Sequence, residues 1–180
     1  SALAREHDLR EQLAYTLHDL FRPYLFCGHP EQAVDVLHES QAMWREMDNK
    51  PMLADSLNVL SGHYALSGEY NRAIEVGQEA LQLSDEIDNV WNQSFGRMQL
   101  SFVYMDRGDY AKAIELMEAS ITLGEKAGFM IPMVLSGALL AWIYAVLGDL
   151  ARGHDWAARA LAQADEMHPR LRIGPLAPEG

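Results

Sequence analysis

Apolar residues in this chain recur at intervals of three and four positions. Leu100 and Tyr104 lie four residues apart, and Ile114, Met117 and Ile121 follow one another at intervals of three and four. Such spacing places apolar side chains on one face of an α-helix, whereas a half-buried strand needs strict alternation of apolar and polar residues. The pattern therefore predicts helices and gives no indication of a sheet.

The helical pattern returns four times at a fixed interval of 40 residues, without a gap. The interval is marked by a leucine, a tyrosine and a glycine column: Leu20, Leu60, Leu100 and Leu140; Tyr24, Tyr64, Tyr104 and Tyr144; Gly28, Gly68, Gly108 and Gly148. Self-similarity at such a period is typical of solenoids, in which each unit buries its apolar face against its neighbours. We expect four helix–turn–helix units, at residues 9–48, 49–88, 89–128 and 129–168.

The two ends of the chain depart from the repeat. Residues 2–8 agree with residues 42–48 at four of seven positions, so residues 1–8 look like the remnant of a preceding unit's second helix. This suggests a piece cut from a longer array. Residues 169–180 contain Pro175 and Pro178, which predict an irregular tail rather than another helix.

Turn-forming residues divide each unit into two halves of 20 residues. The glycine column ends the first half, and a second column ends the other: Asp48, Asp88, Gly128 and His168. Each half has room for a helix of about 16–17 residues and a turn. Asp109 and Asp149 are suited to cap the helix that follows the glycine, and Pro30 suits a first helical turn.

Two columns of small residues indicate where the paired helices approach each other closely. They are Ala33, Ala73, Ala113 and Gly153, and Ser40, Ala80, Ser120 and Ala160. A large side chain at these positions would force the helices apart.

The charge of the chain excludes several classes of partner. The 26 acidic residues against 14 Lys and Arg give a net charge of −12, which argues against nucleic acid and anionic membrane surfaces. No apolar run approaches the roughly 20 residues of a membrane-spanning helix. Cys27 is the only cysteine, so an intrachain disulfide and a thiolate zinc site are excluded, and a reducing compartment, the cytoplasm, is expected.

The motif Leu-x3-Tyr-x3-Gly-x-Tyr-x2-Ala, complete at residues 60–73 and 100–113, resembles the tetratricopeptide repeat. The first unit departs from it at Pro30, and the fourth departs at Leu150 and Gly153. The 40-residue period is similar to the longer-helix variant found in signalling adaptors and in the sensor arms of bacterial ATPase-linked transcription regulators and nucleotide cyclases. HEAT and armadillo repeats have similar periods but lack the Gly-x-Tyr-x2-Ala turn.

This resemblance implies a right-handed superhelix whose concave face is lined by the first helix of each unit. The side chains expected to form an apolar binding groove there are Phe95, Met98, Phe102, Met105, Leu135, Trp142 and Val146, with Arg22, Asp55 and Asn58 orienting polar groups. The same register adds Tyr15, His18, Leu25, Phe26, Gly62, Ala65, Leu66, Asp106, Ala138 and Ala145. The lining is too poor in cationic and amide donors for a clamp that holds a chaperone's terminal carboxylate.

No catalytic constellation stands out. The histidines fall in different columns without metal-ligand spacing, and Cys27 and His29 flank a turn without an identifiable third group. We expect no enzyme activity, no cofactor and no metal. The function expected is a protein, peptide or helix interaction or sensor module of a larger, bacterial regulatory protein. The alternatives are an apolar-metabolite sensor, a self-association scaffold such as a homodimer, and a groove covered by adjoining domains of the parent protein.

Overall fold

The computed structural model of the chain describes residues 9–167, and every regular element among them is an α-helix. The helices are α2 (Arg10–Phe26), α3 (Pro30–Glu46), α4 (Lys50–Leu66), α5 (Tyr70–Glu86), α6 (Val90–Asp106), α7 (Tyr110–Ala127), α8 (Met130–Val146) and α9 (Leu150–Met167). The expected helix remnant at residues 1–8 and the expected tail at 169–180 lie outside the described residues. The all-helical prediction is confirmed, and Pro30 is the first residue of α3.

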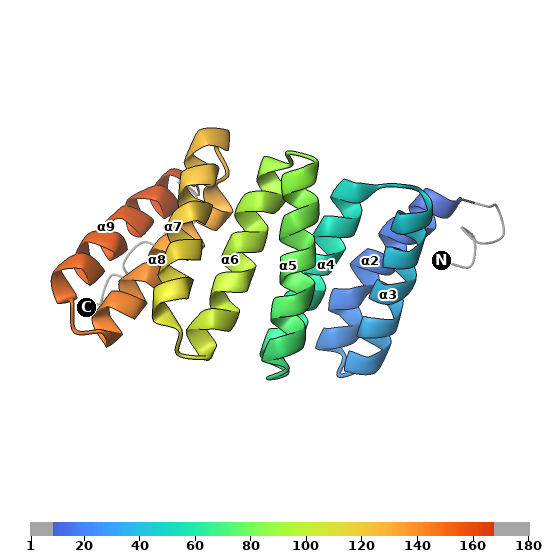
Figure 1. Cartoon of the computed structure of the whole chain (residues 1–180), viewed down its shortest axis with the longest axis horizontal. Coiled ribbons are helices and arrows are strands. Elements are labelled where there is room, and N and C mark those ends of the chain that lie inside the picture. Colours follow the sequence, from blue (N-terminus) through green and yellow to red (C-terminus); the bar gives the residue numbers. More distant parts are fainter. Residues whose placement is uncertain (1–8, 168–180) are drawn as a thin grey trace, which may run out of the picture.

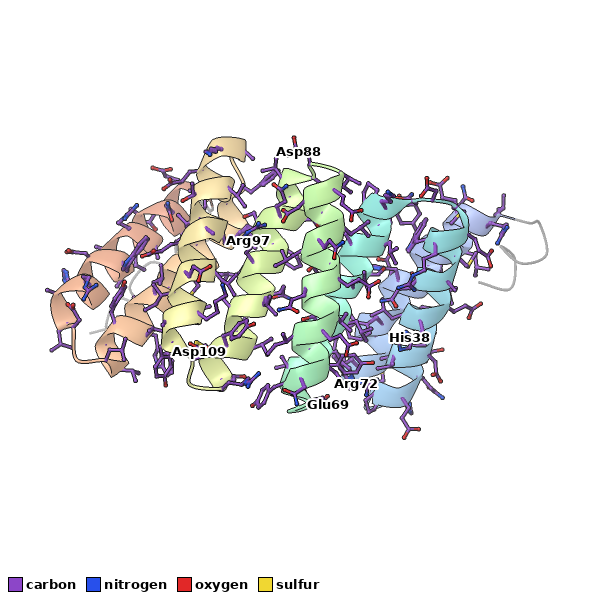
Figure 2. The ribbon with its side chains drawn as sticks, in the orientation of Figure 1. His38, Glu69, Arg72, Asp88, Arg97 and Asp109 are labelled. Carbon is purple, nitrogen blue, oxygen red and sulfur yellow. The ribbon has the colours of Figure 1, made fainter. Side chains whose placement is uncertain are left out.

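The helices end where the two columns of turn residues predicted. Gly68 and Gly108 adopt left-handed backbone conformations with φ of 76° and 80°. This conformation lets the next amide turn back to the tyrosine column: Asp109 N donates to Tyr104 O at 2.9 Å. Asp109 then caps α7, because its Oδ1 accepts from Lys112 N at 3.2 Å. Asp88 ends the other half of its unit with a φ of 50°, and Figure 2 shows Asp88 and Asp109 at opposite ends of the helices.

The eight described helices lie in one row that follows the chain, from α2 and α3 at one end to α8 and α9 at the other (Figure 1). Each helix packs against its neighbours in sequence, and α4 also packs against α6 and α6 against α8. Comparable packing is not found between successive second helices, α3, α5, α7 and α9, in the described part of the chain. Among the first helices, α4, α6 and α8 are therefore more closely spaced than the second helices of this two-layer solenoid, whereas α2 and α4 do not pack comparably.

The core lies between the two layers and runs the length of the array. The largest enclosed side chains include Trp44, Leu37, Leu57, Leu60 and Leu140. Both small-residue columns are buried at every repeat, as predicted. Each unit therefore depends on the next for burial.

Candidate functional site

A cavity of about 480 Å³ opens between α2, α4 and α6. Its lining is mostly apolar and consists of Phe21, Arg22, Leu25, Val59, Gly62, His63, Ala65, Leu66, Phe95, Gln99, Phe102 and Asp106. The residues from α6 are spaced by four, three and four positions, so they share one face of that helix. Cavities of this volume are of the size that binds small ligands or large side chains of a partner.

One glycine and several aromatic rings shape the cavity. Gly62 lets the Gln99 side chain approach α4 closely, since an added Cβ would lie 3.0 Å from Gln99 Nε2. On one side, the Phe21 ring contacts His63 edge to face at a centroid distance of 5.7 Å. On the other, Phe95 stacks on Trp91 at 5.7 Å. The cavity is thus bordered by rings from three helices, which favours an apolar occupant.

Three ionisable groups in or near the cavity, Asp55, His63 and Asp106, differ in their burial and in their ion pairing. Burial raises the pKa of the Asp55 carboxyl, and attraction to His18 and Arg22 only partly offsets this effect. Burial lowers the pKa of the His63 imidazole, and Glu69 opposes that shift. His63 is therefore mainly neutral at neutral pH. Asp106 makes no hydrogen bond or ion pair to another residue of the described range 9–167.

His18, Asp55 and Ser56 form a polar contact between α2 and α4. His18 Nε2 lies 3.4 Å from Asp55 Oδ2, and its Nδ1 lies 2.7 Å from Ser56 Oγ. A nucleophilic serine must be open to substrate, but Ser56 is fully buried. The contact therefore joins two helices and does not form a catalytic triad.

An exposed apolar stripe continues the site along α8. This helix carries no charged residue, although the chain as a whole has a charge of −12. The large side chains exposed along the stripe are Ile131 (47%), Leu135 (44%), Trp142 (50%) and Val146 (51%). Trp91 on α6 stacks on Phe95, which lines the cavity, and contacts Phe129, just before α8, at 5.0 Å.

The structure brings together part of the predicted groove. Arg22, Phe95 and Phe102 line the cavity, whereas Asp55 does not, although the charge of Arg22 acts on its carboxyl. The predicted residues on the stripe are Leu135, Trp142 and Val146.

The other three predicted groove residues lie elsewhere. Met98 and Asn58 are only 2% and 1% exposed, so the expectation that they line the surface is wrong for these two side chains. Asn58 packs against Gly96, where an added Cβ would lie 2.7 Å from Asn58 Oδ1. Met105 is half-buried and packs against the core formed by α7 and α8.

Sequence reasoning missed Phe21, Val59, His63 and Gln99 of the cavity. Gln99 lies four residues after Phe95 and three before Phe102, so a helical wheel centred on these rings would have found it. His63 follows Gly62 by one residue and turns about 100° around the helix axis, a position that the repeat register did not assign to the groove.

Residues 9–167 offer neither a metal-binding cluster nor a membrane-spanning helix. No cluster of three or more His, Cys, Asp or Glu side chains within this range is arranged to hold a metal ion. None of the helices within it is both long and apolar enough to span a bilayer. Cys27 is an exposed free thiol at the end of α2.

Comparison with known proteins identifies the type of fold. No protein-family model matches the sequence, and no curated protein matches it significantly. The crystal structure of MamA aligns with a TM-score of 0.61 and 22% identity, over 87% of this chain and 81% of that chain. BtubC (BKLC) from P. vanneervenii aligns with a TM-score of 0.69 and 16% identity, over 93% and 76% of the two chains.

A third solved structure carries the repeat type in its description. It is a putative Podosopora anserina kinesin light chain with nearly identical TPR-like repeats, which aligns with a TM-score of 0.62 and 19% identity. The alignment covers 86% of this chain and 76% of that chain. The resemblance drawn from the repeated motif is thus confirmed at the level of the fold: this chain is a helical-repeat protein with the tetratricopeptide-like architecture.

Proposed function

We propose that the chain is a non-catalytic interaction module that binds an apolar segment of a partner protein, as a peptide or a helix, in the cavity and along α8. The observation that carries this proposal is the mostly apolar cavity together with a charge-free α8 that exposes large apolar side chains, in a chain of charge −12. Exposed apolar patches of this kind typically mark interaction sites. Covering the half-exposed side chains of α8 would contribute about 1 kcal/mol each.

The wider setting of the module is also part of the proposal. Its long repeat resembles those of adaptors and of sensor arms in bacterial regulators, so we place it in a larger regulatory protein of that kind. The exposed free thiol of Cys27 persists best in a reducing compartment, which supports a cytoplasmic location.

A small apolar molecule is the second candidate ligand. The cavity volume of about 480 Å³ supports it, because small-molecule sites generally measure about 300–1,000 Å³. A small molecule would fill the cavity alone, whereas a peptide or helix would also cover Trp142 on α8. The change in tryptophan emission that Trp142→Gln removes therefore separates the two, since only the longer ligand would shield Trp142.

The test uses a neutral amphipathic model helix built from Leu and Gln, titrated into the protein and followed by calorimetry and tryptophan emission. Phe102→Ser, in the cavity, and Trp142→Gln, on the stripe, are each expected to weaken binding about tenfold. Leu161→Gln is the matched control, because Leu161 is an apolar residue that is 69% exposed on α9, away from the site. Equal affinity in all four proteins, or weakening by Leu161→Gln alone, would exclude the site.

A further inference from the structure

Arg22 and Asp106 are the charged residues that line the cavity, and neither makes an ion pair within residues 9–167. Arg22 attracts the buried Asp55 carboxyl, whereas Asp106 is exposed. His63 adds no positive charge at neutral pH, because burial holds its pKa down. The Asp106 carboxylate is therefore available to a cationic group of a ligand at this mostly apolar site.

The surrounding field has the same sign. The chain carries 26 acidic residues and 14 Lys and Arg, so its long-range potential is negative and attracts cationic partners. A second copy would bring its own charge of −12 towards the site. Charge complementarity therefore favours a basic occupant over a second copy or an acidic helix.

The length and polarity of α8 limit the shape of the occupant. From Ile131 to Val146 the exposed stripe spans about 22 Å, which matches four turns of a partner helix. The stripe offers no charge and no exposed backbone edge for strand pairing, so a partner gains most by laying an apolar helix face along it.

Resting on the proposed function, we infer that the partner segment is a basic amphipathic helix whose apolar face covers the cavity and the α8 stripe and whose cationic flank pairs with Asp106. Apolar burial holds the helix, and the charges set its orientation and raise its association rate. Because the Asp106 pair is exposed, salt weakens it.

Three synthetic helices with the same leucine positions test the inference, with Lys, Gln or Glu at every other position. The Lys helix is expected to bind about tenfold more tightly than the Glu helix at about 0.01 M salt, with the Gln helix between them. This difference should shrink at about 1 M salt. Asp106→Asn should weaken the Lys helix about two- to five-fold and leave the Gln helix unchanged.

Glu118→Gln is the matched control, because it removes one exposed carboxylate of α7 that does not line the cavity. If Glu118→Gln weakens the Lys helix as much as Asp106→Asn does, the attraction is a general effect of net charge and the inference fails. Equal binding of all three helices, each weakened by Phe102→Ser, would also overturn it while leaving the proposed function intact. If none of the helices binds, or if Phe102→Ser leaves their affinity unchanged, the proposed function itself is overturned.

Discussion

Ser94 on α6 and Ser120 on α7 exchange hydrogen bonds across the helix pair. The Oγ of each serine donates to the backbone carbonyl of the other, and both distances are 2.9 Å. Both side chains are fully buried, and Ser136 of α8 donates to Ser120 Oγ at 3.4 Å. The small-residue column at Ser120 thus does more than allow close approach: its hydroxyl fixes the helix that carries Phe95 and Phe102.

Removing either hydroxyl should destabilise the fold without enlarging any side chain. Ser94→Ala and Ser120→Ala are each expected to lower the free energy of unfolding by about 0.5–1.5 kcal/mol, measured by urea denaturation and circular dichroism. Thr122→Val is the control, because the exposed Thr122 hydroxyl bonds only within its own helix, to Glu118 O. Ser94 and Ser120 variants no less stable than Thr122→Val would show that the exchange contributes nothing.

Two helical glycines should respond to alanine in opposite directions. At Gly62 a Cβ meets only the end of the Gln99 side chain, at 3.0 Å, which can rotate away. At Gly96 it would lie 2.7 Å from Oδ1 of the buried Asn58 and 2.9 Å from Cδ2 of Leu81, which is half-buried and packs against the core. We expect Gly62→Ala to raise the free energy of unfolding by up to about 1 kcal/mol and Gly96→Ala to lower it by about 1–3 kcal/mol.

The same two glycine-to-alanine variants separate an effect on stability from an effect on binding. Gly62 lines the cavity, whereas Gly96 does not. Gly62→Ala should therefore weaken the model helix while stabilising the fold, as seen by calorimetry and thermal denaturation. A Gly62→Ala protein that is both less stable than wild type and unaltered in binding would contradict this assignment.

His63 should make the fold sensitive to mild acid. Its pKa is lowered by burial in the folded state and is about 6.5 when unfolded, so the unfolded chain binds the proton more readily. The contribution of the neutral ring is complete above about pH 6.5 and is lost as the pH falls towards the lower folded pKa.

Unfolding free energies of wild type and His63→Gln, compared between about pH 7.5 and pH 5.5, test this sign. Wild type should lose more stability than the variant over this interval, by no more than about 1.4 kcal/mol per pH unit, the limit for one proton. Comparison of the two proteins cancels the other histidines. A steeper loss in the variant would reverse the assignment.

The sequence predicted the backbone of this fold well, because turn chemistry is local. Gly108 and Asp109 act through their own dihedral angles and side chains, and the fixed interval repeats their roles in every unit. The small-residue columns are buried for the same reason, as are Leu60, Leu100 and Leu140, whereas Leu20 in the first unit is only half-buried. The unit boundaries at 9–48, 49–88, 89–128 and 129–168 stay a prediction.

The candidate site was harder to predict, because a small rotation about the helix axis decides whether a side chain faces the groove or the core. Met98 and Gln99 are adjacent in sequence, yet Met98 is enclosed and Gln99 lines the cavity. One residue step turns the side chain by about 100°, and the repeat register alone did not fix which side faces inward. The room for an added Cβ at Gly62 depends on which side chain the neighbouring α6 places there, and this follows only from the tertiary structure.

Leu140 and Trp142, two residues apart on α8, should separate packing from recognition. Leu140 is fully buried, so Leu140→Ala is expected to lower the free energy of unfolding by about 2–5 kcal/mol. Trp142 is 50% exposed and contacts Tyr110 only edge to face, at 6.4 Å. Trp142→Gln should therefore cost less than about 1 kcal/mol of stability while weakening the model helix about tenfold. If Trp142→Gln instead destabilises the protein as much as Leu140→Ala does, Trp142 is a packing residue and α8 is not part of the binding site.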